Sequence, residues 1–482
     1  MHGWRLELTY AELPALFYAE ATPTPVPAPR LAAFNTTLAT TLGLNPETLN
    51  GSVGAQIFGG NVLPEGARSI AQAYAGHQFG RFTSLGDGRA ILLGEQITPS
   101  GDRMDIQLKG AGPTTFSRRG DGRAALGPML REYIISEAMH ALGIPTTRSL
   151  AVVTTGEPVY RDSTLPGAVL TRVASSHIRV GTMQWAAAHG DSTALEALSN
   201  YTRARHYPEI TGVAHPHLAL LEAIIGRQAQ LIARWQLAGF IHGVMNTDNM
   251  ALSGDTIDYG PCAFMDAYDP DTVFSSIDHD GRYAYGQQPS IALWNLARLA
   301  EAMLPLFDSD QARAVELATT SLESFDVLFT EHWLNGMRAK LGLFTEEPDD
   351  QSLADDLLTW MHQRSADFTN TFRTLTTSTL MDGPGASDAA LAEWHQRLAA
   401  RRARQSQSGV EVEALMRRHN PSVIARNHLV EEALAAATTA GDFSVMARLL
   451  DVLAAPYDHD RPVSRFTSPE VSGRPYRTFC GT

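Results

Sequence analysis

The stretch from Gly239 to Cys262 constrains this chain more than any other part of the sequence. It places the acid–amide pair Asp248-Asn249 shortly before Asp258, with a short apolar strand between them. A hard divalent cation that keeps water and phosphate oxygens takes one or two carboxylates and an amide oxygen, and not a cage of His and Cys. The stretch therefore predicts a metal–phosphate site on a loop that follows an amphipathic helix ending at Gly239.

The same stretch is spaced like the catalytic loop and metal-binding segment of protein kinases, where an Asn and an Asp hold the metal. In the kinase pattern His-Arg-Asp-x-x-x-x-Asn, the catalytic base lies five residues before the Asn. Here that position is Val244, and valine cannot accept a proton. Two interpretations remain: the chain is not a catalyst, or it performs different chemistry within the same frame.

A glycine-rich turn, Gly86-Asp87-Gly88-Arg89, lies between two β-prone runs. Glycines at such a turn let backbone N–H groups come close to an oxyanion, and Arg89 would add a fork of charged donors. The alternative is an ordinary hairpin turn, for which Gly-Asp-Gly is also common.

The next strand ends in a lysine. Ile106 and Leu108 alternate onto one face, and Lys109 falls on the other. The context matches the phosphate-binding lysine of kinases, although an exposed lysine at a strand end is the plainer interpretation. Pro128 then begins a predicted helix on which Glu132 lies off the apolar stripe. Glu132 either pairs with Lys109, as in kinases, or only favours the helix dipole.

Two further basic segments have paired interpretations. Residues 114–127 are rich in Arg and Gly and contain Asp121-Gly122, either as a solvated loop or as a phosphate clamp. Arg172 and Arg179 flank the crossing into the second half of the chain, where they either reach one polyphosphate or are solvated linker residues. Each signal alone is weak, but their order along the chain predicts a nucleotide–metal site.

We therefore predict an α+β, protein-kinase-like fold with two lobes. Residues 75–173 would form the first lobe, an antiparallel sheet plus one helix, and residues 174–455 a mainly helical lobe with the catalytic and metal loops and extra C-terminal helices. Residues 1–74 would be an extension that packs on the body, and residues 456–482 a C-terminal tail that carries Cys480 and is flexible over 473–482. Predicted elements are strands over 150–155 and 167–173 with a turn at 156–158, and helices over 32–42, 291–304, 314–341, 353–375, 391–404 and 423–437. The basic run at 401–404 is predicted to be a solvated helix face.

Bulk properties narrow the class of protein. A formal net charge of −14 argues against a general nucleic-acid or anionic-membrane binder. The N-terminus lacks the pattern of a secretory signal, and no run approaches the roughly 18 apolar residues of a spanning helix. Two cysteines cannot form a disulfide framework and fit a reducing compartment. We expect a cytoplasmic monomer without nucleic-acid or membrane partners.

Four blocks of the sequence carry a more specific resemblance: residues 74–95, 107–161, 172–181 and 240–270. They closely resemble the selenoprotein O (SelO, YdiU) family of pseudokinases, over nearly the whole chain. Motifs such as Tyr-Ala-Gly-His-Gln-Phe-Gly and His-Gly-Val-Met-Asn-Thr-Asp-Asn are not general kinase features. The resemblance implies a protein adenylyltransferase that binds ATP inverted relative to kinases, uses Mg²⁺ or Mn²⁺, and transfers AMP to Ser, Thr or Tyr hydroxyls of protein partners.

The resemblance also implies roles for individual residues. Asp248 would be the general base, Asn249 and Asp258 the metal ligands, and Glu132 the partner of Lys109. The residues implied to contact the nucleotide are Gly86, Gly88, Arg89, Lys109, Asp121, Gly122, Arg172 and Arg179.

An inverted nucleotide accounts for Val244. The α-phosphate would face the acceptor hydroxyl, and pyrophosphate would leave, so that negative charge develops deep in the site. Lys109, Arg172 and Arg179 would neutralise that charge, which is more cation than a single kinase lysine supplies. The role of proton acceptor would then move to Asp248.

Other interpretations stay open. One is uridylyl transfer from UTP with Mn²⁺; another is ordinary phosphorylation, which Val244 disfavours; a third is a non-catalytic, ATP-binding scaffold. Selenoprotein members of the family carry selenocysteine near the C-terminus, and bacterial relatives carry cysteine there. This suggests a reversible Cys262–Cys480 disulfide, with two independent thiols as the alternative.

Overall fold

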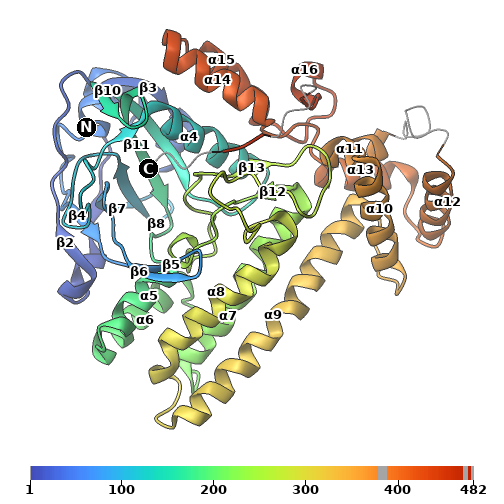
Figure 1. Cartoon of the computed structure of the whole chain (residues 1–482), viewed down its shortest axis with the longest axis horizontal. Helices are drawn as coiled ribbons and strands as arrows, with labels where there is room; N and C mark the ends of the chain where they lie inside the picture. The colour runs from blue at the N-terminus through green and yellow to red at the C-terminus, as the bar shows by residue number, and fades with distance from the viewer. Residues whose placement is uncertain (1, 378–387, 471–475, 479–482) are drawn as a thin grey trace.

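A large antiparallel sheet and a set of mostly long helices make up the protein, as a computed structural model describes it for residues 2–377, 388–470 and 476–478 (Figure 1). This is the α+β composition predicted from the sequence. Within those residues, no helix is both long and apolar enough to cross a membrane.

Nine strands form the main sheet, and every pair within it is antiparallel. Residues 1–74 contribute four of these strands, so the N-terminal segment adds to the sheet as well as packing on it. In spatial order the strands are β2 (Tyr18–Glu20), β4 (Ile70–Gln72), β7 (Ala90–Ile97), β8 (Arg103–Lys109), β11 (Thr164–Ala174), β10 (Arg148–Tyr160) and β3 (Arg30–Phe34), with β1 (Leu6–Glu7) on β7 and β9 (Ala124–Ala125) on β11.

The sheet is covered on both faces because side chains alternate along its strands. Leu92 of β7 packs into a core with Leu130 of α4 (Leu126–Ala141). Ile91 and Leu93 point the other way, into a core with Phe58. That second core is closed by three short helices, α1 (Thr36–Thr41), α2 (Pro46–Leu49) and α3 (Ser52–Phe58).

Two helices from the C-terminal part of the chain cover α4. They are α14 (Asn427–Ala440) and α15 (Ser444–Leu453), and both contact α4 (Figure 1). Residues more than 280 positions apart in sequence, such as Arg131 and Glu431, thus become neighbours. The helix that bears Glu132 is held between the sheet and the end of the chain.

The remaining helices form the second half of the molecule. Among them α7 is a long helix that ends at Gly239, whose φ of 70° is left-handed. Glycine is the residue that adopts this conformation at the lowest cost. These helices are α5 (Val180–Ala188), α6 (Ser192–His206), α7 (Pro216–Ala238), α8 (Gln288–Met303), α9 (Gln311–Lys340), α10 (Asp350–Arg364), α11 (Phe368–Thr377), α12 (Ala389–Arg402), α13 (Gly409–His419) and α16 (Ser464–Thr467).

The helix predicted over 32–42 is wrong in its first part. Residues Arg30–Phe34 form β3, which pairs antiparallel with β10. Helix α1 begins only at Thr36, and the side chain of Asn35 caps it by accepting from Leu38 N. Pairing at the edge of the sheet overrides the local helical preference, since it supplies backbone hydrogen bonds from a distant strand.

Two other predicted elements differ in detail. The predicted helix over 353–375 is two helices, α10 and α11, because Ser365 adopts a left-handed φ of 47°. The turn predicted at 156–158 lies instead within β10, which continues to Tyr160 past an irregular register. Helix α13 lies in the part of the chain predicted to be helical, between two of the predicted ranges.

The prediction of a solvated face at 401–404 is wrong for Arg401 and Arg402, whereas the side chain of Arg404 is 50% exposed. Arg401 is 1% exposed and its Nε donates to Asp350 Oδ1 at 2.7 Å. Arg402 donates to the carbonyl of Leu341 at 2.7 Å. The two guanidinium groups join α12 to neighbouring helices because an acid and a free helix-end carbonyl lie within their reach.

Candidate active site

Two short strands bracket the loop that carries Asp248, Asn249 and Asp258. β12 (Phe240–Ile241) pairs antiparallel with β13 (Ala263–Phe264), so the two ends of the loop between these strands lie side by side. The loop between them makes a single 3-10 turn at Thr247–Asn249. Asp258 has a φ of 64°, a conformation that non-glycine residues rarely adopt and that is often found at functional sites.

One cavity of about 710 Å³ joins this loop to the sheet. It brings together every residue assigned to the nucleotide, the metal or the base, while Glu132 reaches Lys109 from behind its wall. The sequence-derived residues that line it are Gly86, Gly88, Arg89, Lys109, Asp121, Gly122, Arg172, Arg179, Asp248, Asn249 and Asp258. Val244 lines it too, and is 8% exposed.

Three cations surround Asp258 in the cavity. Its Oδ1 accepts from Lys109 Nζ at 2.8 Å and from Arg172 at 2.6 Å, and its Oδ2 accepts from Arg179 at 3.3 Å. Glu132 binds two of the same cations, Lys109 at 2.7 Å and Arg172 at 2.8 Å. Burial opposes ionisation of Asp258, but Arg172, Lys109 and Arg179 outweigh it and hold the pKa well below its ordinary value.

The carboxyl group of Asp248 has a different environment. Burial raises its pKa to about 6, although Arg179 lies close enough to oppose the shift. Its Oδ1 is buried and has no hydrogen-bond partner among the described residues. Gly76 lies against it so closely that a Cβ there would overlap Oδ1. A carboxylate poised near neutral pH in a cavity has the properties that a general base needs.

The chemistry of the donor set fits one divalent metal. Asn249 donates its Nδ2 to the carbonyl of Val244 at 2.9 Å, which leaves its amide oxygen for another ligand. Asp258 contributes a carboxylate in the same cavity. Neither this site nor any other part of the described chain contains a cluster of three or more His, Cys, Asp or Glu that could hold a metal ion. A site with few protein oxygens suits a cation that keeps water and phosphate ligands.

Two N–H groups of the glycine turn are bonded within the protein. The N–H of Asp87 donates to Gln72 and that of Gly88 donates to Gly86, so these two donors are already used. Gly86 has a φ of 111°, and a Cβ there would overlap Phe116. The glycines therefore let the loop after β8 pack tightly over the turn.

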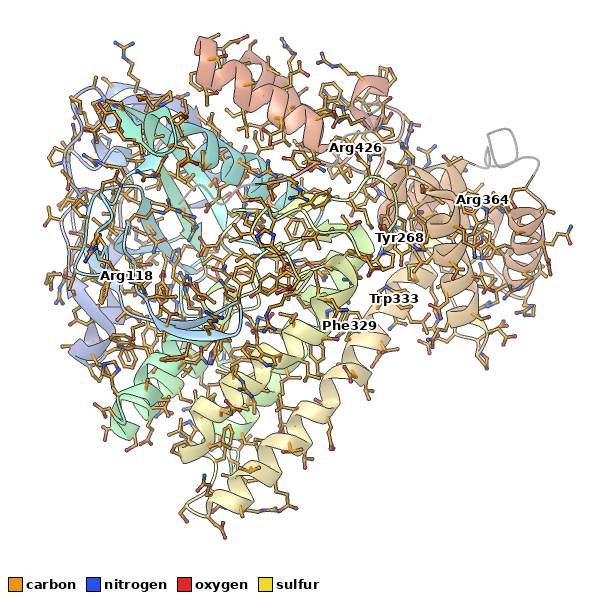
Figure 2. All side chains as sticks on the ribbon, viewed as in Figure 1. Arg118, Tyr268, Phe329, Trp333, Arg364 and Arg426 are labelled. Carbon is orange, nitrogen blue, oxygen red and sulfur yellow. The ribbon has the colours of Figure 1, made fainter. Side chains whose placement is uncertain are left out.

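Asp121 and Gly122 lie on that same loop. Asp121 accepts from Arg161 at 2.8 Å, which lowers the pKa of its carboxyl group, and it also caps the N–H of Arg123. Arg118, labelled in Figure 2 on the sheet side of the molecule, donates to the carbonyl of Ser84.

Several residues of the cavity were missed in the sequence. The Arg179 guanidinium lies 4.3 Å above the ring of Tyr74, a cation–π contact that fixes one of the three cations. Asp87 is buried and accepts from Gln107 at 3.1 Å. Arg161, which binds Asp121, lines the cavity as well. The motif around Tyr74 was noted, but no local pattern shows which loop it touches.

The hairpin formed by β5 (Ala75–Gln78) and β6 (Arg81–Ser84) supports the loop between β12 and β13 directly. The N–H of His77 donates to Thr247 Oγ1 at 2.7 Å, and the N–H of Phe79 donates to Asn246 Oδ1 at 3.0 Å. Gln184 of α5 accepts from the same Thr247 hydroxyl at 2.7 Å. The turn that contains Asp248 is thus held from two sides.

Cys262 is fully buried, and burial raises the pKa of its thiol to about 12. Cys480 lies outside the described residues, so the pairing inferred from the sequence has no geometry here. The described part of the tail does reach this segment: Thr478 donates its hydroxyl to the carbonyl of Pro261 at 2.7 Å.

Known proteins resemble the chain over its full length. Residues 4–454 match the family model described as "Protein adenylyltransferase SelO". Two curated relatives named "Protein nucleotidyltransferase YdiU" come from Bacillus mycoides (strain KBAB4) and Halalkalibacterium halodurans. The first is 58% identical over 481 residues, covering 100% of this chain and 99% of its own. The second is 59% identical over 482 residues, covering 100% and 98%.

Proposed function

The chain belongs to the SelO family of protein adenylyltransferases and is a nucleotidyltransferase, and from that premise we propose its reaction. It transfers AMP from ATP to Ser, Thr or Tyr hydroxyls of proteins and releases pyrophosphate. The observation that carries the proposal is the group of three cations, Lys109, Arg172 and Arg179, around Asp258 in a cavity that also holds Asp248.

The fold is taken to be protein-kinase-like, with the nucleotide between the sheet half and the helical half. Support comes from the order of the elements: a sheet whose β8 ends in Lys109, a helix with its paired Glu132, and then the loop with Asn249 and Asp258. Val244 occupies the place of the kinase base, which argues against transfer of the γ-phosphoryl group.

The transfer step balances as follows. Asp248 accepts the proton of the acceptor hydroxyl while the oxygen forms a bond to the α-phosphorus of ATP. The bond from that phosphorus to the α,β-bridging oxygen breaks, and pyrophosphate leaves with the electron pair. Lys109, Arg172 and Arg179, which line the same cavity, neutralise the charge of the leaving group.

Asn249 and Asp258 would hold Mg²⁺ or Mn²⁺, which neutralises phosphate charge when bound. Asp258 keeps Lys109, Arg172 and Arg179 in place by ion pairs of 2.8, 2.6 and 3.3 Å. These cations are then already oriented when phosphates arrive. Pre-organisation of this kind lowers the reorganisation cost of the transition state.

Labelled nucleotides test the proposal. We expect label from α-³²P-ATP, and none from γ-³²P-ATP, to appear on proteins of a cell extract and on the enzyme itself. Lys109→Met should reduce the rate at least about 100-fold because it removes a cation from the leaving-group end. The matched control is Lys340→Met: Lys340 is the chain's other lysine, is buried, and lies outside the cavity.

The competing functions give other results. Transfer of the γ-label would indicate a kinase, and binding of ATP without transfer of either label would indicate a scaffold. Preferential labelling from α-³²P-UTP in Mn²⁺ would indicate uridylyl transfer. Full activity of Lys109→Met would contradict the assignment of this cavity as the site.

A further inference from the structure

Arg131, the neighbour of Glu132 on α4, joins three distant segments of the chain. It is 7% exposed. Its guanidinium donates to the carbonyl of Cys262 at 2.6 Å, to Glu431 Oε1 at 3.0 Å and to the hydroxyl of Tyr476 at 2.9 Å. These partners belong to the segment between Asp258 and β13, to α14 and to the C-terminal segment 476–478.

The C-terminal segment is itself docked on the same region. The hydroxyl of Tyr476 donates to Glu431 at 2.6 Å. The N–H of Thr478 donates to Phe274 at 2.8 Å, and its carbonyl accepts from Ser276 at 2.9 Å. The hydroxyl of Thr478 also donates to Pro261. The C-terminal segment therefore contacts the chain after Asp258 at two places, Pro261 and residues 274–276.

Arg131 is connected to the active site through two short stretches of chain. On α4 the next residue is Glu132, which holds Lys109 and Arg172. On the other side Cys262 lies just after Asp258, which binds the same two cations. The guanidinium therefore connects α4, which carries Glu132, to the segment that carries Asp258. These two acids bind Lys109 and Arg172.

We propose that Arg131 is a positioning residue: it couples the docked C-terminal segment and α14 to the geometry of Glu132, Lys109 and Asp258. The inference rests on the proposed function for its catalytic readout. The coupling is non-covalent, so it operates whether or not Cys262 and Cys480 form a bond.

Stability alone gives a weak reason for a cation in this place. Burying a guanidinium costs desolvation, and its one carboxylate partner, Glu431, has a side chain that is 50% exposed. On removal of Arg131, Glu431 can be solvated again, and only one buried carbonyl loses its donor. A large effect on the reaction with a small effect on stability would separate positioning from a merely structural role.

The test compares Arg131→Met, Arg131→Lys and Tyr476→Phe with wild type, all under reducing conditions, by transfer kinetics from α-³²P-ATP. We expect Arg131→Met to lower kcat at least about tenfold with KM for ATP changed less than about threefold, because α4 and the metal loop lose their common anchor. Arg131→Lys should recover part of kcat, and Tyr476→Phe should lose less than Arg131→Met. Arg401→Met, which removes a buried arginine of another cluster, is the control for general destabilisation.

Hydrogen exchange supplies a readout that does not depend on catalysis. In Arg131→Met we expect faster exchange over both 126–135 and 258–264, and in Arg401→Met at neither segment. Unchanged kcat in a folded Arg131→Met protein, or exchange that stays slow over 258–264, would overturn the proposal. If wild type transfers no label at all, the proposed function fails, and the exchange data alone decide the coupling.

Discussion

At the scale of single residues, Asp248 is placed where function and stability oppose each other. The carboxyl group is buried, and its pKa is about 6 in the folded protein against an ordinary value of 3.8. Because the folded-state pKa is the higher one, ionisation of Asp248 opposes folding. The penalty is full above about pH 6 and disappears below about pH 4, where the group is protonated in both states.

Asp248→Asn should therefore abolish transfer and yet stabilise the protein. At pH 8 we expect a gain of about 1–3 kcal/mol in the free energy of unfolding, which shrinks as the pH falls to 4.5. Wild-type kcat/KM should rise with pH up to about 6 as the base ionises. Urea unfolding at both pH values and a pH–rate profile measure this, and a loss of stability at pH 8 would contradict the burial argument.

Gly76 carries a second residue-scale prediction. A Cβ at this position would overlap Asp248 Oδ1, so Gly76→Ala must move the carboxyl group or the hairpin that holds the catalytic loop. We expect transfer to fall at least about 100-fold while ATP still binds, since the phosphate-binding cations are untouched. Gly409→Ala is the control, because a Cβ there meets no atom within 4 Å.

At the scale of elements, the end of α7 sets the direction of the metal loop. Gly239 has a φ of 70°, and a Cβ there would meet the ring of Phe368. The chain enters β12 at the next residue, so a shift at Gly239 is passed to the loop with Asp248 and Asn249. The position of the loop therefore depends on the end of α7 and on its cap at Gly239.

Gly239→Ala is expected to lower the free energy of unfolding by about 1–3 kcal/mol, from left-handed strain and the contact with Phe368, and to reduce transfer as well. Gly226→Ala in the middle of the same helix provides the matched opposite case. No atom lies within 4 Å of its Cβ, so better helix propensity should stabilise the protein by about 0.5–1 kcal/mol. Equal destabilisation by both changes would contradict the role given to the cap.

At the scale of the whole molecule, the fold should not depend on its metal. No cluster of three or more potential ligands holds two segments together anywhere in the described chain, and Asp258 is already paired with three cations. Chelation by EDTA should therefore leave Tm within about 1 °C and abolish transfer.

Mg²⁺ with ATP should in turn raise the stability by mass action, by about 2.7 kcal/mol at 100 times Kd, in wild type and not in Lys109→Met. Thermal unfolding in EDTA, in Mg²⁺ alone and in Mg²⁺ with ATP measures both effects. A drop in Tm of more than about 5 °C on chelation alone would indicate a structural metal and contradict the assignment.

Features that depend on near neighbours along the chain could be predicted from the sequence. Alternation placed Lys109 at a strand end, helical spacing turned Glu132 away from the apolar stripe, and Gly239 marked the end of α7. Each of these follows from periodicity or from the conformational range of one residue. The composition and order of the elements were enough to predict a nucleotide site.

Tertiary structure alone decided which groups meet. The partners of Arg131 lie as far as 345 residues away in sequence, Gly76 packs against Asp248, and a run of arginines that looked solvated is buried at Arg401. Periodicity identifies the face on which a side chain lies, but not what lies opposite it. Closing such long loops costs conformational entropy, and these contacts form only when the whole chain folds.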